Sequence, residues 1–461
     1  MESFIDVAPD SDFPLENLPW GVFEAPGADG TPETHIGVAL GEHAVSATAV
    51  EAAGLLKDLP GVKKGVFATG QLNEFAAAGR PAWRSARAQL QRLLGAAEGA
   101  LRDDPALRPR AIFKQSEVRM RLPCAIGDYT DFYTSRQHAS NVTHMFRGQG
   151  TPLNPNWLHL PVAYHGRSSS IVPSGVDVRR PWGQRLPPKP PAAEEGQGSA
   201  PPPAGSAAAP AAGAAPPTPI FAPSAAVDFE LEMGAIIGPG NSHGEPIPVA
   251  SAWDHVFGLV LLNDWSARDI QLWEYVPLGP FNAKNWASQI SPWVVTLDAL
   301  EPFKTKPPPQ TEAEVLPYLR DPDSYTYDVR LTAAVTPAGA DQGTVITRSN
   351  LRHLYWTHAQ MIAHHTVGGC NLRPGDLIGS GTISGDTPDS RGCLLELTWA
   401  GRDPVGLAGP GGAAVQRTYL EDGDGVAFRA GCGGEGEGAG AGARRIGFGT
   451  CSGRLLPARE A

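Results

Sequence analysis

The stretch Val227-Asp-Phe-Glu-Leu-Glu-Met233 decides the fold that we expect for most of this chain. Its apolar side chains alternate with Glu230 and Glu232. Residues i and i+2 of a strand point to the same face, so the two glutamates project together, opposite an apolar face. An edge strand with a solvated acidic face is the common alternative. The continuation Gly-Ala-Ile-Ile237 has the composition of a buried segment and favours an interior strand.

A second stretch, Phe257-Gly-Leu-Val-Leu-Leu262, is a continuous apolar run, which is typical of a strand buried on both faces. It ends abruptly at Asp264, which places a carboxylate at the end of a buried strand. The residues that follow can start a short helix, with Asp264 or Ser266 as its cap. Arg268 and Gln271 would share one face of that helix, because they are three positions apart.

The stretch Ile126-Gly-Asp-Tyr-Thr-Asp-Phe-Tyr-Thr-Ser-Arg-Gln-His138 combines two carboxylates, two phenols, an arginine and a histidine. Aromatic residues beside carboxylates indicate a half-buried cleft in which pKa values can be shifted. A surface loop with a single histidine is an equally good interpretation of the stretch alone. Asp131 and His138 are therefore candidate site residues whose role depends on partners elsewhere in the chain.

The chain as a whole has the composition of an ordinary globular protein. Its 461 residues suggest roughly two to four domains. A net charge of -11 argues against a nucleic-acid-binding surface, which would need a basic face. No apolar window is long enough to span a membrane, and no secretory signal is visible at the N-terminus. The five cysteines are odd in number and form no Cys-x-x-Cys pair, which favours a reducing compartment, the cytoplasm, over a disulfide framework or a structural zinc site.

Two units are predicted, residues 1–120 and residues 121–461. The second has the aromatic, glycine and short apolar runs of a β-rich domain. The first contains a helix from Pro81 to Ala97, whose apolar residues recur every three or four positions. The other face of this helix carries three arginines that we expect to be solvated: Arg84, Arg87 and Arg92.

Residues 186–224 interrupt the second unit with Pro, Ala and Gly repeats. Such a tract cannot bury enough apolar surface to offset its chain entropy, so it is predicted to be a disordered insertion. Deletion of residues 190–220 is expected to leave folding and activity nearly unchanged. A smaller run, 433–442, is predicted to be a flexible hairpin tip.

A helix is predicted between Ser349 and Val367, with Ser349 or Asn350 as its cap. Its histidines lack the His-Glu-x-x-His pattern of a zinc site, so we interpret them as surface or satisfied interior residues. The segment 394–399 is predicted to be a strand. It places Glu396 among apolar neighbours, where a carboxylate needs a partner.

Four carboxylates are candidates to face inward together: Asp131, Glu230, Glu232 and Asp264. If they converge, each ionised pair at about 4 Å repels by roughly 4 kcal/mol at an effective dielectric near 20. The repulsion over all pairs, on the order of 20 kcal/mol as an upper bound, exceeds a typical folding stability of ~5–15 kcal/mol. Either the four do not converge, or a hard divalent cation lies among them. All-oxygen ligands favour Mg²⁺ or Ca²⁺ over zinc.

Two further groups would complete a hydrolytic site. A carboxylate such as Glu396 on one imidazole nitrogen of His138 would fix the tautomer and make the other nitrogen a base for water. Donors able to stabilise an oxyanion are Arg268, Gln271 and Lys284. If the three groups meet, the chemistry is metal-assisted hydrolysis.

The motifs together resemble the fumarylacetoacetase family. The resemblance covers nearly the whole chain and begins at Ser11-Asp-Phe-Pro14. The segments that carry it are Asp-Tyr-Thr-Asp-Phe-Tyr133 with Arg-Gln-His-Ala139, Asn-Trp-Leu-His-Leu-Pro-Val-Ala-Tyr-His-Gly-Arg167, Phe-Glu-Leu-Glu-Met233, Asn-Asp-Trp-Ser-Ala-Arg-Asp-Ile-Gln271 and Ser-Gly-Thr-Ile-Ser-Gly385. The Glu-x-Glu and Asp set alone would indicate only the wider superfamily.

The resemblance implies a mainly β fold, with a small N-terminal SH3-like barrel and a large β-rich catalytic domain of the roll or sandwich type that forms a homodimer. It implies Ca²⁺ at the four carboxylates and Mg²⁺ near Asp264, Lys284 and Ser288. The chain departs from the family at Ser288, where threonine is usual but the hydroxyl is kept. It also departs in the length of the Pro/Ala tract.

The resemblance also implies the role of each site residue. His138 is the base, with Glu396 behind it, and Arg268, Gln271 and Lys284 form the oxyanion hole. The expected substrate-binding residues are Tyr133, Arg147, Tyr164, Gln271, Tyr275 and Thr382.

The implied activity is hydrolysis of fumarylacetoacetate to fumarate and acetoacetate, the last step of tyrosine and phenylalanine breakdown. A 1,3-diketone can chelate a divalent cation through its two oxygens. Water deprotonated by His138 would then attack the carbonyl on the fumaryl side. The alternatives are an acylpyruvate hydrolase, or another enzyme acting on a β-dicarbonyl acid, and a non-catalytic scaffold. The N-terminal unit and the Arg-Gln-His-Ala segment favour fumarylacetoacetase, and no expected base or ligand is lost.

Overall fold

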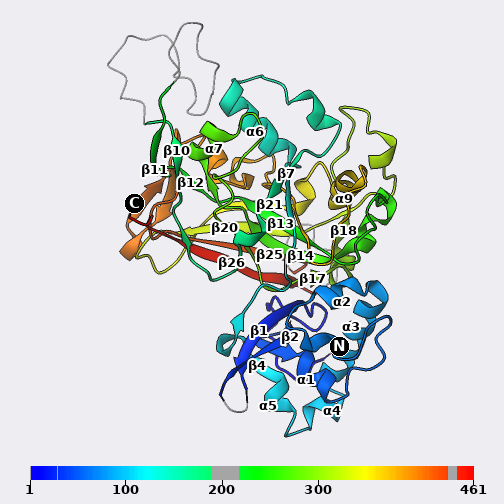
Figure 1. Ribbon diagram of the computed structural model, residues 1–461. Helices are drawn as coiled ribbons and strands as arrows, with labels where there is room; N and C mark the ends of the chain where they lie inside the picture. Colours follow the sequence, from blue (N-terminus) through cyan, green and yellow to red (C-terminus); the bar gives the residue numbers. More distant parts are fainter. Residues whose placement is uncertain (1, 28–29, 188–216, 435–443, 461) are drawn as a thin grey trace.

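A smaller N-terminal unit and a larger β-rich body make up the protein (Figure 1). The computed structural model describes residues 2–27, 30–187, 217–434 and 444–460. The predicted mainly β architecture is confirmed. The predicted hairpin tip lies almost wholly outside the described residues, as does most of the Pro/Ala tract.

A five-stranded antiparallel sheet forms the N-terminal unit, in the order β4-β3-β2-β1-β5. Its strands are β1 (Trp20–Pro26), β2 (Pro32–Leu40), β3 (His43–Ser46), β4 (Ile112–Lys114) and β5 (Arg119–Met120). The accompanying helices are α1 (Ala47–Ala52), α2 (Asn73–Ala77), α3 (Arg80–Leu94), α4 (Gly99–Arg102) and α5 (Arg108–Ala111). The apolar face predicted for α3 is buried, but Ala97 lies beyond the helix end and is exposed.

The main sheet of the larger body has eight strands and carries the acidic motifs. Along its path lie β7 (Ala163–Gly166), β6 (Tyr129–Phe132), β22 (Leu377–Gly379), β13 (Leu231–Ile237), β14 (Val256–Asn263), β16 (Ser288–Ile290) and β8 (Ile171–Pro173), and β17 (Val295–Thr296) also pairs with β14. Asp131 lies opposite Gly379 and Tyr164 in this sheet, and Glu232 lies opposite Leu262. The acidic motifs therefore lie close together in the sheet, on β6 and β13 with β22 between them and at the end of β14.

A second sheet of five strands packs over the main one. Its strands, in order, are β21 (Thr344–Asn350), β20 (Arg330–Thr336), β25 (Gly425–Cys432), β26 (Ile446–Leu456) and β9 (Val178–Arg179). Four short pairs complete the β structure: β10 (Trp182–Arg185) with β11 (Ile220–Pro223), β12 (Val227–Asp228) with β15 (Ser266–Ala267), β18 (Lys304–Thr305) with β19 (Thr326–Tyr327), and β23 (Val405–Ala408) with β24 (Ala414–Arg417). The helices of this body are α6 (Arg136–Arg147), α7 (Arg268–Glu274), α8 (Leu297–Leu300), α9 (His358–Thr366) and α10 (Leu394–Leu397).

Strand β14 is buried along its whole length because both of its faces meet a core. Leu259 and Leu261 belong to the core shared with the second sheet. Val260 and Leu262 belong to a core shared with the N-terminal unit, where the Trp83 ring lies 5.1 Å from that of Phe257. This double burial explains the uninterrupted apolar run of the sequence.

Two predicted elements are wrong in type or extent. The helix predicted from Ser349 begins only at His358, because Thr357 and Gln360 form a capping box there, and Ser349 and Asn350 end strand β21. The segment predicted as a strand at 394–399 begins instead with helix α10. Backbone donors at its start bond to the carboxylate of Asp228, a long-range contact that local sequence does not reveal.

Three further expectations need correction. Helix α7 has no side-chain cap, because Ser266 lies in β15 and Asp264 is engaged elsewhere. Part of the 186–224 tract is ordered, since β11 pairs with β10. Arg87 is not solvated, because its guanidinium donates to the backbone carbonyls of Glu16 and Asn17.

The described residues contain no helix with both the length and the apolar character needed to cross a bilayer.

We expect Phe229→Ala to lower the free energy of unfolding by about 3–5 kcal/mol, because removing a buried phenyl ring leaves a cavity. Phe229 is fully buried, and its ring lies 5.6 Å from that of Phe428 in the second sheet. Phe281, whose exposure is 67%, is the matched control. Phe281→Ala should change stability by no more than about 0.5 kcal/mol. Urea unfolding of both variants measures this, and equal losses would contradict the assigned packing.

Candidate active site

His138 and Glu396 form a buried pair between helices α6 and α10. Ser135 caps α6 by accepting from the backbone N–H of His138. Nδ1 of His138 lies 2.6 Å from Oε2 of Glu396, and both side chains are buried. A carboxylate at Nδ1 favours the tautomer with its proton there, which leaves Nε2 able to accept a proton from water. The structure therefore brings together the pair predicted from sequence.

Glu396 has three further partners that sequence reasoning did not find. Ser384 Oγ donates to Oε2 at 2.7 Å, Asn141 Nδ2 donates to Oε1 at 2.8 Å, and Cys393 Sγ lies 3.2 Å from Oε2. Burial alone would raise the pKa of Glu396, but the charge and hydrogen bond of His138, with the bonds from Asn141 and Ser384, lower that pKa to about 2. Glu396 is therefore ionised at neutral pH.

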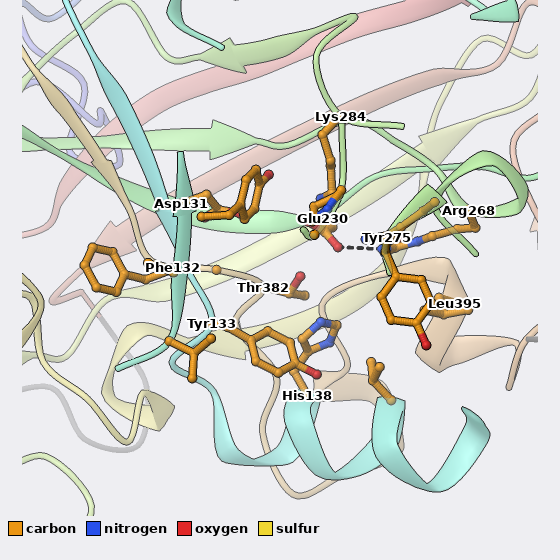
Figure 2. Close-up of a pocket in the computed structure, with 18 of the residues that line it drawn as sticks. Asp131, Phe132, Tyr133, His138, Glu230, Arg268, Tyr275, Lys284, Thr382 and Leu395 are labelled. Carbon is orange, nitrogen blue, oxygen red and sulfur yellow. Dashed lines mark hydrogen bonds and ion pairs between the residues drawn. The ribbon is translucent and has the colours of Figure 1, made fainter. Parts of the chain in front are cut away.

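The four predicted carboxylates converge. Ligand oxygens of Asp131, Glu230, Glu232 and Asp264 all lie within 4.8 Å of one another, and all four residues are buried. Asp131 lies in β6 and Glu232 in β13, while Glu230 directly precedes β13 and Asp264 directly follows β14. Figure 2 shows Asp131, Glu230 and Lys284 at one end of the pocket.

Two carboxylate oxygens of this cluster lack a hydrogen-bond donor among the described residues. Oδ1 of Asp131 and Oε1 of Glu232 are buried without a hydrogen-bond partner among the described residues. Burial raises the pKa of both carboxyls well above the usual value, and the neighbouring carboxylates raise it further. A cation bound between them would remove both costs, so the donor set fits a hard divalent ion.

The surroundings of the cluster hold its carboxylates in place, and glycine at position 379 lets Asp131 approach closely. A Cβ added at Gly379 would stand 2.9 Å from Oδ1 of Asp131. Asp264 accepts from Tyr164 Oη at 2.9 Å and from Ser288 Oγ at 3.0 Å, so its oxygens are held in place. The hydroxyl of Ser288, the residue at which the chain departs from the family pattern, thus reaches Asp264.

The three predicted oxyanion donors lie beside the cluster. Lys284 Nζ donates to Glu230 and, at 2.6 Å, to Asp264 Oδ2. Arg268 Nη1 donates to Glu230 Oε1 at 2.7 Å and to Gln271 Oε1 at 3.2 Å (Figure 2). Burial would raise the pKa of Glu230, but Lys284 and Arg268 outweigh it and lower that pKa below its usual value.

A cavity of about 380 Å³ joins these groups. His138, Asp131, Glu230, Arg268, Gln271 and Lys284 line it, whereas Glu232, Asp264, Ser288 and Glu396 stand behind the lining residues. Its apolar wall is formed by Val142, Phe146, Val162, Leu272, Leu278 and Leu395. The cavity is large enough for a small molecule, whose polar part would lie at the carboxylates and whose apolar part would lie against this wall.

Five of the six predicted substrate-binding residues line this cavity: Tyr133, Tyr164, Gln271, Tyr275 and Thr382. The Tyr133 ring lies edge-on to that of His138, with centroids 5.3 Å apart. Thr382 Oγ1 is buried without a hydrogen-bond partner in the described part of the chain and is open to a ligand. Arg147 is exposed at the end of α6, where its Nη1 donates to Asn154 Oδ1 at 2.6 Å, so the structure does not bring it to the pocket.

Some of the functional residues that the sequence analysis missed have a signal in the sequence, and others have none. Asn141 lies one helical turn after His138, and Asp228 lies two residues before Glu230, so spacing could have found both. The backbone bridge that brings Cys393 opposite Glu230 has no local signal, and neither has the contact of Ser384 with Glu396.

Comparisons with known proteins agree with this geometry. The chain matches the family model described as "Fumarylacetoacetate (FAA) hydrolase C-terminal" over residues 129–455 and that described as "Fumarylacetoacetase N-terminal" over residues 16–123. It is 49% identical over 458 residues to the fumarylacetoacetase of Arabidopsis thaliana, covering 99% of each chain. It is 47% identical to that of Rattus norvegicus and 46% identical to that of Homo sapiens, again covering 99% of each chain.

We expect the protein, stripped of divalent ions by a chelator, to melt at a higher temperature when Ca²⁺ or Mg²⁺ is added. An ion that binds only the folded state at a hundredfold excess over its dissociation constant stabilises it by about 2.7 kcal/mol. Asp131→Asn should abolish most of this response, because it removes a ligand charge. The control is Asp128→Asn, since Asp128 is an exposed acid in the same stretch. An unresponsive wild type, or an equal response in the Asp131 variant, would contradict the cation site.

Proposed function

Because the chain belongs to the fumarylacetoacetase family, we propose that it hydrolyses the carbon–carbon bond of fumarylacetoacetate and releases fumarate and acetoacetate. This would be the last step of tyrosine and phenylalanine breakdown. The observation that carries the proposal is one cavity that joins the His138–Glu396 pair to the carboxylate cluster. A base for water and a place for a β-dicarbonyl group thus lie side by side.

His138 is the general base in this proposal. With Nδ1 bonded to Glu396, Nε2 takes a proton from a water molecule while the hydroxide adds to the carbonyl carbon on the fumaryl side. Glu396 stabilises the imidazolium that forms, because it is ionised and its own position is fixed by Asn141 and Ser384. His138 then carries the proton that the reaction needs later.

Arg268, Gln271 and Lys284 are proposed to stabilise the oxyanion of the tetrahedral intermediate. Lys284 has three N–H donors and, among the described residues, donates to Glu230 and Asp264, which leaves a third donor for the substrate. Collapse of the intermediate breaks the carbon–carbon bond and leaves its electron pair on acetoacetate as an enolate. Protonation of that carbon completes the turnover, and fumarate leaves as the acid.

We propose Ca²⁺ as the ion held by Asp131, Glu230, Glu232 and Asp264, and Mg²⁺ near Asp264, Lys284 and Ser288. Oxygen ligands at this density suit both ions. A bound divalent ion would act as a Lewis acid toward the two oxygens of a 1,3-diketone. Tyr133, Tyr164, Tyr275 and Thr382, with Gln271, are proposed to hold the substrate. Arg147 keeps its proposed role as a partner for a terminal carboxylate, which would require its side chain to leave Asn154.

The remaining expectations from the resemblance are also proposals. We propose a homodimer, a cytoplasmic location, and a division into an N-terminal domain of residues 1–120 and a catalytic domain of residues 121–461. The five cysteines are all free, which fits a reducing compartment. Two exposed apolar side chains in one loop, Val276 and Leu278, support a surface covered by a second copy.

The proposed substrate can be tested against its nearest rivals. Loss of absorbance of fumarylacetoacetate should be fast with the wild type, and kcat/KM for acylpyruvates should be far lower. A preference for acylpyruvates would move the assignment to a sister enzyme of the superfamily. Activity on neither class would support a non-catalytic scaffold.

The sharpest test of the mechanism concerns His138. We expect His138→Ala to lower kcat by about 10²–10⁴-fold, the usual contribution of a general base, with the metal content and fold retained. Glu396→Gln should have a milder effect on kcat, because it keeps the shape of the side chain but removes the negative charge that stabilises the imidazolium. The double variant should be scarcely worse than His138→Ala, since the two residues act as a unit. Independent, multiplying losses, or a rise in KM alone, would show that His138 only contacts the substrate.

A further inference from the structure

Asp228 is a third acid on the face that carries Glu230 and Glu232, but it does not line the cavity. It is fully buried. Its strand, β12, pairs with β15, which places Asp228 opposite Ser266. The backbone N–H of Arg268 donates to Ala226 at 2.9 Å, so the chain is held close to Arg268 on this side.

One side of the Asp228 carboxylate holds Arg268. Arg268 Nε donates to Oδ2 of Asp228 at 2.8 Å, and Nη2 lies 2.8 Å from the same oxygen. Nη1 is thereby turned toward Glu230 and Gln271. The orientation of the guanidinium in the pocket thus depends on Asp228.

The same carboxylate also holds helix α10. Oδ1 accepts from the backbone N–H of Leu394 at 2.7 Å, and Oδ2 accepts from that of Leu395 at 2.9 Å. The next residue is Glu396, whose Oε2 lies 2.6 Å from His138 Nδ1. A continuous series of direct contacts therefore runs from Arg268 through Asp228 and α10 to His138.

We propose that Asp228 is a positioning residue that couples the oxyanion donor Arg268 to the Glu396–His138 base, an inference that rests on the proposed function. The carboxylate limits the distance between the two groups, because it bonds to Arg268 and to the start of α10 at the same time. A displacement of one group shifts the other. The oxyanion donors and the base must both be correctly positioned around the same substrate carbon. This coupling therefore affects the rate of the chemical step.

Asp424 offers a matched control for a purely structural role. It is also fully buried and pairs with an arginine, since Arg417 Nε donates to its Oδ2 at 2.8 Å. It also accepts from two backbone N–H groups, those of Glu421 at 2.9 Å and Ala338 at 3.2 Å. Asp424 reproduces the bonding of Asp228, but its arginine, Arg417, does not line the cavity, whereas Arg268 does.

The experiment compares Asp228→Asn with Asp424→Asn in the full chain, loaded with divalent ion and assayed on fumarylacetoacetate below both melting temperatures. We expect Asp228→Asn to lower kcat per folded protein by about 10²-fold, the cost of small misplacements in a catalytic site, with KM changed by no more than about threefold. Asp424→Asn should lower the melting temperature but leave kcat within about twofold of wild type, because surrounding packing can hold a remote loop. Combining Asp228→Asn with Arg268→Lys should cost less than the product of the two single losses.

Equal effects of the two substitutions on kcat, or multiplying losses in the double variant, would overturn the proposal. If Asp228→Asn does not fold, Asp228→Glu and Asp424→Glu replace the pair. Glutamate keeps the charge but moves the carboxylate, so only the Asp228 variant should lose kcat, by about tenfold; equal retention of kcat would overturn the proposal. A wild type that does not turn over fumarylacetoacetate would instead reject the proposed function.

Discussion

Four carboxylates lie together in one buried cluster, in or next to three strands of the main sheet. Their mutual repulsion is the constraint for which the rest of the site must compensate. Charges this close in a partly dry interior cost more than a fold can spare unless they are neutralised. Lys284 and Arg268 supply two positive charges, both directed at Glu230. Asp131 and Glu232 keep oxygens that no described residue satisfies, which is why the fold itself points to a divalent ion.

The two cationic side chains that neutralise the cluster, Lys284 and Arg268, are also the proposed oxyanion donors. Lys284 bridges Glu230 and Asp264, and Arg268 bridges Glu230 and Asp228, so neither can move freely. A donor that is already immobile does not need to reorganise when an oxyanion forms beside it. In the proposed reaction, the arrangement that neutralises the buried carboxylates would therefore also stabilise the transition state.

Much of this site could be predicted from sequence because its signals are local. The alternation around Glu230 gave the shared face, and the abrupt end of the apolar run gave Asp264. The errors arose where long-range contacts override local preference. Helix α10 was expected to be a strand because Leu-Leu-Glu-Leu-Thr-Trp has apolar alternation, and only Asp228, more than a hundred residues earlier, supplies the acceptors that start the helix. Arg87 was expected in solvent because its partners lie in a distant turn.

Strand β14 ends in the site, yet one of its faces packs against the N-terminal unit, which holds none of the proposed catalytic residues. Val260 and Leu262 pack against that unit, and Asp264 lies two residues after Leu262. The packing of this face therefore influences where Asp264 lies. Damage to the N-terminal core is thus felt at the cation site without any change to the pocket. Among natural variants of such a chain, harmful substitutions are therefore expected on both faces of this strand and in both units, and a survey confined to the pocket would miss those in the N-terminal unit.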